Sequence, residues 1–459
     1  MRGVPIALAA ILLLPMATSA ALPRADLALV ETLIENDLRD VDLLRLVATK
    51  TGLSPSALSI PSALPSELPR LLSQLAERAG THLPVTSAEE FAALDPRLQA
   101  PLATLAAATL LAWDLRDASF IALTPAEEIE LVRLQAAGTL NTPRGAQLAG
   151  GVDPQPMIEG AILLLDTLET IVIPQLQTAI DAGAWPAAGA WDPVGILRLG
   201  STGNDVETLD RLIQIDPTGD DTYRNNAGAT NMNDIGAERH TQPRFLVSIS
   251  LDFAGNDEYI GRNAMFGFPV EGQGSGVIGI GILHDLAGDD YYRCREFCQG
   301  GASQGVGYFR DQSGKDYARG TKAIGYGQSA GIGIHRNDAG DDIYYTGMGG
   351  GHAYGTTAEE DAIATGILWD RGGTDRYESG QSIRAYGFVD GWGRGWLADE
   401  GPETDYYETA DASKVGPSQF LHGCNTCTWI SSFRGNPIAP GGRGVDDQGG
   451  LAYLLATAP

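Results

Sequence analysis

The chain has 459 residues, with 58 acidic against 31 basic side chains and a formal net charge of −27. This length is sufficient for two or three domains, each with its own core. The strong negative charge argues against nucleic acid or an anionic membrane surface as a partner.

Residues 1–21 have the pattern of a secretory signal peptide. Arg2 supplies an early positive charge, an apolar run follows from Val4 to Leu14, and small residues lead up to Ala21. The run is too short for a comfortable membrane span, and we expect no transmembrane segment after cleavage. A buried N-terminal helix is the alternative. We therefore expect a secreted, periplasmic or cell-surface protein, in a compartment where cysteines can pair.

Residues 22–190 are rich in Ala and Leu at helical spacing. Leu102, Leu105 and Ala106 lie three and four positions apart, which places one face against a core. Helix starts are indicated where Ser87 precedes two acidic residues and where Thr124 precedes a proline. We predict an α-helical bundle of about six helices, including a long one at about 156–182, with a packing or partner-binding role.

From residue 191 the chain is rich in Gly and repeats one motif: Asp, two residues, Gly, one residue, Asp, one residue, Tyr. Successive copies start 26 to 36 residues apart. The acidic positions of the regular copies are Asp216 and Asp221, Asp252 and Asp257, Asp285 and Asp290, Asn337 and Asp342, and Asp370 and Asp375. Two irregular copies contain Asp311 and Asp316, with the tyrosine one place early at Tyr317, and Asp399 and Asp405, with one extra residue.

Each repeat unit contains short apolar segments of strand length, such as 280–283, separated by Gly turns. No unit contains a helical stretch, and a propeller blade usually needs about 40 residues or more. We therefore predict an α+β chain in which the helical bundle is followed by a Gly/Asp-rich β-solenoid of about seven coils over 191–410. A β-propeller is the alternative. Gly203, Asn204 and Asp205 resemble a degenerate first coil, as expected for a terminal repeat.

The repeated turn predicts a calcium site. Its central Gly lets the backbone adopt positive φ, so the two acids can converge on one point, and Ca²⁺ prefers such oxygen-rich turns. The alternative is that each Asp only caps its own turn. Carboxylates stacked about 4.8 Å apart repel one another unless something neutralises them, which favours Ca²⁺ at the fourteen positions. The recurring Tyr predicts a stacked ladder, with a sugar-stacking surface as the alternative.

The cores of these turns, as at 288–292, 340–344 and 373–377, resemble the haemolysin-type Ca²⁺-binding repeat of secreted bacterial proteins. That resemblance implies Ca²⁺ between successive turns of a parallel β-roll. The family repeats a nonapeptide in tandem, whereas this chain has one turn per coil, so the roll itself does not carry over. The order of features also resembles an uncharacterised group of exported prokaryotic proteins with Asp-x-Gly-Gly-x-Asp-x-Tyr rungs, most closely at 216–227, and this resemblance implies no activity.

Four cysteines complete the candidate residues. Cys294 and Cys298 lie within one coil, and Cys424 and Cys427 belong to a C-terminal cap over 411–459. In an exported chain two local disulfides are expected. A redox motif, or half of a zinc site with His422, are the alternatives for the second pair.

Together these features predict an exported, Ca²⁺-stabilised repeat protein with a structural or interaction role at or outside the cell surface, whose partner is a cell-surface protein or a glycan. The alternative is a polysaccharide-active lyase or hydrolase on a β-helix scaffold, for which His335, Arg336, His352 and Arg293 are the non-periodic polar residues. An active site breaks a repeat once, whereas these acids follow it throughout. We therefore expect no catalytic residue among them.

Overall fold

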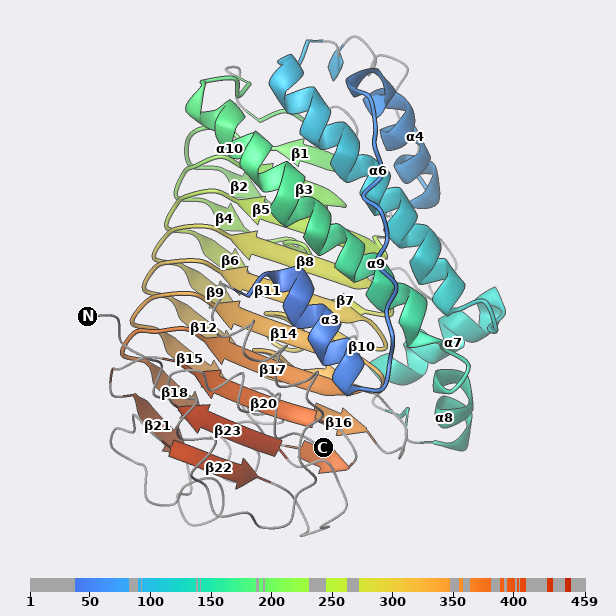
Figure 1. The fold of residues 1–459 in the computed structure, drawn as a ribbon, viewed down its shortest axis with the longest axis vertical. Helices are drawn as coiled ribbons and strands as arrows, with labels where there is room; N and C mark the ends of the chain where they lie inside the picture. Colours follow the sequence, from blue (N-terminus) through green and yellow to red (C-terminus); the bar gives the residue numbers. More distant parts are fainter. Residues whose placement is uncertain are drawn as a thin grey trace, which may run out of the picture.

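The computed structural model describes two regions, an N-terminal series of helices and a C-terminal stack of parallel strands (Figure 1). The described residues are 38–446, with gaps at 82–89, 92, 138, 141, 187–189, 193–194, 231–244, 262–271, 347–354, 358–363, 381–388, 392–393, 401–402, 404, 410–426 and 432–441. The structure does not describe the predicted signal peptide, the predicted helix start at Ser87, or the side chains of Cys424, His352 and His422.

The described helices confirm the predicted helical region. They are α3 (Asp40–Lys50), η1 (Pro65–Glu67), α4 (Leu68–Arg78), α6 (Pro96–Ser119), α7 (Pro125–Ala136), α8 (Pro143–Ala149), α9 (Pro154–Thr167), η2 (Leu168–Val172) and α10 (Ile173–Asp181). Two of them, α6 and α9, begin with a proline that directly follows an N-cap residue, Asp95 or Asp153. The side chain of that Asp accepts a hydrogen bond from the backbone N–H of the residue after the proline. The predicted long helix is confirmed as α9 and α10, which are joined by the π-helical turn η2.

The C-terminal region is a β-solenoid with three sheets, so the predicted solenoid is confirmed and the propeller alternative is wrong. Sheet 1 contains β1 (Leu197–Leu199), β3 (Ile213–Asp216), β5 (Val247–Asp252), β8 (Ile280–Asp285), β11 (Val306–Asp311), β14 (Ile332–Asn337), β17 (Thr365–Asp370), β20 (Arg394–Asp399), β23 (Gly442–Asp446) and β22 (Cys427–Ser431). Sheet 2 contains β2 (Val206–Glu207), β4 (Thr222–Tyr223), β6 (Glu258–Ile260), β9 (Tyr291–Arg293), β12 (Tyr317–Gly320), β15 (Ile343–Thr346), β18 (Arg376–Ser379) and β21 (Tyr406–Thr409). Sheet 3 contains β7 (Gly276–Val277), β10 (Ala302–Ser303), β13 (Gly327–Gln328), β16 (Gly355–Thr357) and β19 (Val389–Gly391).

Successive coils stack in parallel, and the chain passes from sheet 3 to sheet 1 to sheet 2 within a coil. Sheet 1 keeps one register from β5 to β20, so that Asp252, Asp285, Asp311, Asn337, Asp370 and Asp399 follow one another on neighbouring strands. At the C-terminal end β22 pairs antiparallel with β23, which closes that edge of the sheet. The repeat spacing in the sequence therefore corresponds to one coil per copy of the motif.

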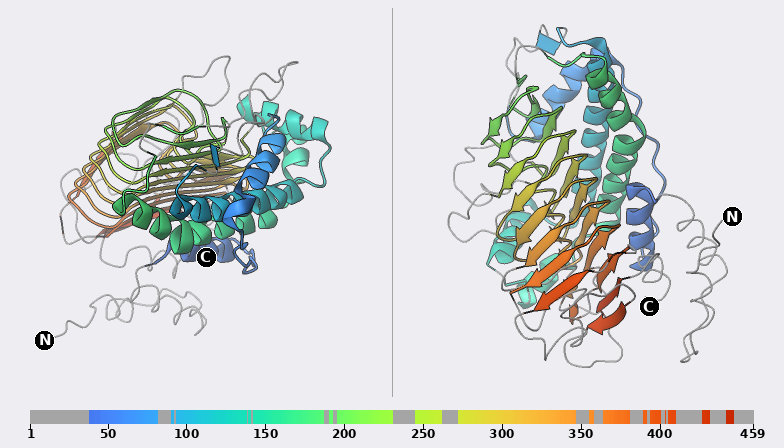
Figure 2. Two further views of the ribbon diagram at one scale, coloured as in Figure 1. Left: turned by 90° about the horizontal axis from the view of Figure 1, so that it is seen from above. Right: turned by 90° about the vertical axis from the view of Figure 1, so that its left-hand side faces the viewer.

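The helices cover the outer face of sheet 1 (Figures 1 and 2). In β8 the side chains of Ile280 and Ile282 join the same hydrophobic cluster as α6 and α9, whereas Leu283 belongs to a second cluster inside the coils. Because both faces of sheet 1 are covered, its central strands are buried along their whole length. The helices and sheet 1 thus share one hydrophobic core.

The helix α6 is long and apolar enough to cross a membrane by length and composition alone. In this structure 56% of its most apolar window is buried, and α6 contacts α9, α4 and β5. Its apolar character is therefore accounted for by packing in the core.

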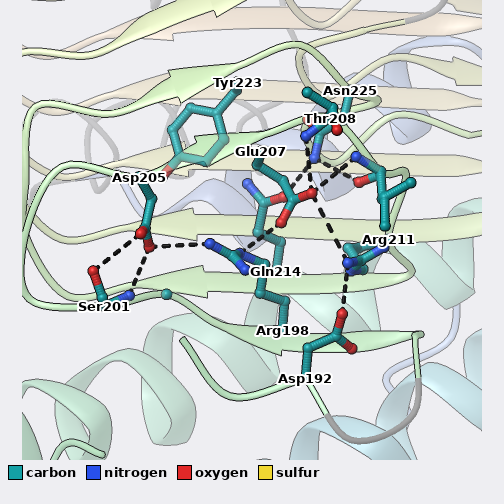
Figure 3. A network of polar contacts seen from close by, with 12 residues as sticks. Asp192, Arg198, Ser201, Asp205, Glu207, Thr208, Arg211, Gln214, Tyr223 and Asn225 are labelled. Atoms are coloured by element: carbon teal, nitrogen blue, oxygen red, sulfur yellow. Dashed lines mark hydrogen bonds and ion pairs between the residues drawn. The ribbon is translucent and has the colours of Figure 1, made fainter. Parts of the chain in front are cut away.

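The first coil closes the N-terminal end of the solenoid with ion pairs (Figure 3). The Nε atom of Arg198 lies 2.7 Å from Oε2 of Glu207, and Arg198 also pairs with Asp205 at 3.0 Å. The Arg211 guanidinium pairs with Asp192 at 2.5 Å. In sheet 1, Arg198 is in register with Gln214 and Ser250, and apolar or aromatic side chains occupy this position only from Leu283 of β8 onward. This confirms an atypical terminal coil at the predicted place.

Candidate metal site

The repeated acids form two rows at the corner between sheets 1 and 2. The first residue of each acidic pair is the last residue of a sheet 1 strand, and the second directly precedes a sheet 2 strand. All fourteen predicted positions are at most 4% exposed. The rows therefore lie in the interior of the coils, away from solvent.

The second row is held by backbone hydrogen bonds between coils. In each step the N–H group of one acid donates to Oδ1 of the equivalent acid in the next coil, as from Asp221 to Asp257 at 2.6 Å and from Asp342 to Asp375 at 2.7 Å. The same bond connects Asp205 of the first coil to Asp221. Asp205 therefore belongs to this row, which its Gly-x-Asp context indicated but which the predicted ligand set omitted.

The first row uses its two carboxylate oxygens differently. At Asp216, Asp252, Asp311, Asn337 and Asp370, Oδ1 caps its own turn, accepting for example from the backbone N–H of Thr218 at Asp216. This confirms the turn-capping interpretation for one oxygen. At Asp252, Asp285, Asp311 and Asp370, Oδ2 accepts from a tyrosine hydroxyl of the preceding coil, as from Tyr223 to Asp252 at 2.6 Å.

The tyrosines form the predicted stacked ladder inside sheet 2. Ring centroids are 4.6 Å apart for Tyr223 and Tyr259, and 4.8 Å apart for Tyr377 and Tyr407, with nearly parallel planes. Tyr317 does not join the ladder, because its register partner is Tyr291 on the outer face. The interior position of that coil is Ala318, and the gap is filled from sheet 1, where Phe309 packs edge-on against Tyr292 and His335 stacks on Phe309.

The coil that lacks the interior tyrosine is also the coil before the Asn. With Ala318 in that place, no tyrosine hydroxyl is available to the next first-row side chain, Asn337. The Asn337 Nδ2 group instead donates to Oδ2 of Asp342 at 2.8 Å. Here the acid pair of the other coils is replaced by a neutral donor and one acceptor.

In the other coils the first-row residue is Asp, whose carboxylate accepts hydrogen bonds, in place of Asn337, whose Nδ2 group donates one. Oδ2 of Asp257, of Asp316 and of Asp375 is buried and receives no hydrogen bond within the described part of the chain. Each of these residues is paired in its motif with a first-row Asp, whose oxygens accept but do not donate when ionised. An unpaired buried carboxylate oxygen is costly, so a cation or a shared proton is required at these places.

The carboxylates of neighbouring coils approach closely enough to share one cation. Within each of the following groups, one oxygen per residue lies within 4.8 Å of the others: Asp205, Asp216 and Asp221; Asp221, Asp252 and Asp257; Asp257, Asp285 and Asp290; Asp290, Asp311 and Asp316; Asp342, Asp370 and Asp375. Oxygens bound to one Ca²⁺ at about 2.4 Å are at most about 4.8 Å apart. The structure therefore brings the predicted ligands together in groups that fit a divalent cation.

Burial and mutual repulsion raise the pKa of these acids. The pKa of Asp290 is raised to about 10, by burial and then by the charge of Asp285. The pKa of Asp257 is raised to about 8 and that of Asp342 to about 9 by the same two causes, with Asp285 and Asp370 as the main neighbouring charges. Without a bound cation, part of the ladder therefore keeps its protons at neutral pH.

The remaining predicted residues have separate places. Cys294 and Cys298 form a disulfide, as predicted, whereas Cys424 and the side chain of Cys427 lie outside the described residues. His335 is inside the coils and Arg336 faces the helices, where its Nη1 lies 2.6 Å from Oδ1 of Asp40. Arg293 lies on the outer face of sheet 2. The structure does not bring these three non-periodic residues together in one site.

Comparison of the chain with protein-family models, curated proteins and solved structures finds no match.

Proposed function

We propose that the chain is an exported repeat protein whose solenoid is stabilised by Ca²⁺ bound along the aspartate ladder, with a structural or interaction role at or outside the cell surface. The observation that carries this proposal is the contrast between coils. Asn337 supplies a hydrogen-bond donor to Asp342, whereas Asp257, Asp316 and Asp375 each have a buried oxygen without one.

The chemistry of the groups favours Ca²⁺ over softer metals. The ligand atoms are carboxylate oxygens, without His or Cys among them, and hard oxygen ligands suit Ca²⁺. Three carboxylates leave further coordination positions for water or backbone carbonyl oxygens. A bound cation would bring positive charge to a place where burial otherwise favours protonated carboxyl groups.

The position of the ladder supports a structural role for it. Acids that are at most 4% exposed have little contact with solvent and cannot reach a polymer outside the coils. Export is supported by the N-terminal sequence pattern and by the disulfide between Cys294 and Cys298, which suits an oxidising compartment. The outer face of sheet 2, which the helices do not cover, remains for partners.

Thermal unfolding with Ca²⁺ and with excess EGTA tests the proposal. A ligand that binds only the folded state raises its stability by about 2.7 kcal/mol at 100 times Kd for each site, so we expect a higher midpoint with Ca²⁺. The variant Asp370→Asn places an amide donor beside Asp375, as Asn337 does beside Asp342. It should show a smaller Ca²⁺-dependent rise and bind less ⁴⁵Ca²⁺ in equilibrium dialysis.

The matched control is Asp289→Asn, which removes one charge from the same type of turn. Asp289 is exposed, and the equivalent position in the preceding coil is Asn256, whose Oδ1 accepts from the Asp289 backbone N–H at 2.8 Å. Its Ca²⁺ response should equal that of the unchanged protein. Absence of any Ca²⁺ response in the unchanged protein would show that protons alone neutralise the ladder. Equal losses in both variants would show that the Ca²⁺ response does not come from the buried ladder.

A further inference from the structure

A cavity of about 390 Å³ opens on the outer face of sheet 2, whereas the aspartate ladder lies inside the coils. The cavity is lined by basic side chains and the ladder consists of acidic ones. Its lining comes from successive coils and includes Ile260, Arg293, Arg295, Arg319, Thr321 and Tyr345. Its volume falls within the range of ordinary ligand sites. Three of these residues are arginines, in a protein with a net charge of −27.

Two of the arginines are direct neighbours on adjacent strands. Arg293 of β9 is in register with Arg319 of β12, and both side chains are exposed. Neighbouring strands lie about 4.8 Å apart, so these two positive charges repel each other. Within the described part of the chain, neither they nor Arg295 form an ion pair with a carboxylate, whereas the adjacent Lys322 pairs with Glu296 at 3.3 Å.

The surrounding structure holds the arginines in place. The Cys294–Cys298 disulfide closes the loop that carries Arg295, and the Arg295 carbonyl accepts from the Thr321 backbone N–H at 2.7 Å. The Arg319 guanidinium lies over the Tyr345 ring, 4.9 Å from its centroid. The disulfide loop thus positions the backbone at Arg295 and the aromatic ring orients the Arg319 guanidinium before any ligand binds, which lowers the entropy cost of binding.

We propose that this cavity binds an acidic oligosaccharide, with sugar carboxylates held by Arg293 and Arg319. The planar guanidinium binds a carboxylate through two parallel hydrogen bonds, and the two successive coils of β9 and β12 place one such group each along the solenoid axis, as neighbouring units of a uronic acid chain each carry a carboxylate. Beside the arginines, Tyr291 and Tyr317 stack on the same face with ring centroids 5.2 Å apart. Such rings offer flat apolar surfaces to sugars.

The net charge limits the ligand to a short segment. A long polyanion such as a nucleic acid would meet the negative field of the whole protein, whereas a few carboxylates within the cavity contact the local positive charge. This site does not depend on the calcium proposal, because it shares no residue with the ladder.

Calorimetric titration with trigalacturonate tests the proposal, with its fully methyl-esterified form as the neutral ligand. We expect binding of the acid and at least about tenfold weaker binding of the ester, since the ester lacks the charged carboxylate oxygens that accept from the guanidinium groups. Arg293→Gln and Arg319→Gln should each weaken trigalacturonate binding by about tenfold or more. The matched control is Arg376→Gln, because Arg376 lies on the same sheet face but pairs with Glu378 at 2.6 Å. It should bind as the unchanged protein does.

Three results would overturn the proposal. They are no binding of trigalacturonate, equal binding of the methyl ester, and unchanged binding by Arg293→Gln and Arg319→Gln variants with normal unfolding midpoints. Full competition by inorganic phosphate at concentrations similar to those of trigalacturonate would also overturn it, since that would indicate a simple anion site. The Ca²⁺ dependence of the midpoint is read separately, so this site and the ladder can fail independently.

Discussion

At the scale of single residues, the ladder shows a consistent pairing of donors with acceptors. In four coils the hydroxyl of the interior tyrosine donates to the first acid of the next coil, as from Tyr259 to Asp285 at 2.8 Å. Where Ala318 replaces the tyrosine, the next first-row residue is Asn337 and not an acid. The neutral Asn337 amide stands where other coils have a charged carboxylate, and its N–H group supplies a donor in a coil that receives none from a tyrosine hydroxyl. The tyrosine hydroxyls and the Asn337 amide therefore supply donors to some of the buried oxygens, and the acid pairs that keep an oxygen without a donor are the places where a cation or proton is needed.

The central glycine of the turn permits the close stacking of the coils. A Cβ atom on Gly314, whose φ is +155°, would lie only 1.4 Å from the carbonyl oxygen of Gly288 in the preceding coil. At Gly203, in the first coil, a Cβ would meet no atom within 4 Å, because no earlier coil lies beneath it. The requirement for glycine thus comes from the neighbouring coil.

We therefore expect Gly314→Ala to be strongly destabilising and Gly203→Ala to be tolerated. The first change forces backbone apart at a place where non-glycine residues also strain φ, and a loss of roughly 3 kcal/mol or more is expected. The second should cost less than about 1 kcal/mol. Urea unfolding measures both. Similar losses in the two variants would contradict a stacking origin for the glycine.

At the scale of elements, one buried carboxylate connects the helix α3 to sheet 1. Oδ1 of Asp40 accepts from the Tyr308 hydroxyl at 2.7 Å, and Arg336 and Arg310 lie 2.6 Å and 3.1 Å from its two oxygens. Burial opposes ionisation of Asp40, but Arg336, Arg310 and His284 outweigh it and hold the pKa of Asp40 well below its usual range. Burial lowers the pKa of His284 to about 4, so the imidazole is neutral at physiological pH. The helix is thus fixed to the sheet by charge as well as by apolar packing.

Removing this charge should weaken the attachment of α3. In Asp40→Asn the two arginines lose a buried counter-charge, for which a cost of about 3–5 kcal/mol is expected. The control is Asp42→Asn on the same helix, where the partly exposed carboxylate pairs with Arg39 at 2.9 Å and where a loss of less than about 1 kcal/mol is expected. Urea unfolding and hydrogen exchange of α3 measure both effects. Equal protection of α3 from hydrogen exchange in the two variants would contradict the role of the Asp40 carboxylate in attaching α3 to sheet 1.

The elements also show which features were predictable from sequence. The period of the motif determined the solenoid, because it places one Gly-centred turn in each coil and short apolar segments between turns. It also brought the acids together as predicted. The contact of Asp40 with Arg336 was not predictable, since the two residues are 296 positions apart and nothing in the helical periodicity marks Asp40. Likewise, Arg293 and Arg319 become neighbours only through the register of β9 and β12, outside the repeated motif.

At the scale of the whole molecule, the two hydrophobic clusters have different roles. The larger one joins the helices to the outer face of sheet 1, and the smaller one fills the coils with tyrosine and other apolar side chains. The aspartate rows border the smaller cluster, so their charge is desolvated along the length of the solenoid. The first coil is an exception, because Arg198 and Arg211 supply positive charge to its acids. Stability of the interior therefore depends on what neutralises the middle coils.

This dependence predicts opposite effects of pH and Ca²⁺. The pKa of Asp257 is raised to about 8, that of Asp216 to about 9 and that of Asp290 to about 10, each first by burial and then by neighbouring acids, whereas an unfolded chain has an Asp pKa of about 3.9. Groups with a raised folded pKa stabilise the fold fully below about pH 4, and this contribution is lost as pH rises toward 8–10. In EGTA the unfolding midpoint should therefore fall between pH 5 and pH 9.

Calcium should reverse that fall, because Ca²⁺ binds the ionised carboxylates and competes with protons. The Ca²⁺-dependent rise in midpoint should be larger at pH 8 than at pH 5. The stability contributed by Asp40 does not change between pH 5 and pH 8, because a lowered carboxylate pKa gives stability that is lost only below about pH 4. The neutral His284, whose pKa is lowered to about 4, gives stability that is lost as pH falls below about 6.5, so the comparison must be made against Asp370→Asn at each pH. That variant retains the Asp40 cluster and should show a smaller pH-dependent gain with Ca²⁺. A Ca²⁺ effect that is equal at both pH values, or greater at pH 5, would mean that the cation does not bind the acids whose protons the interior otherwise retains.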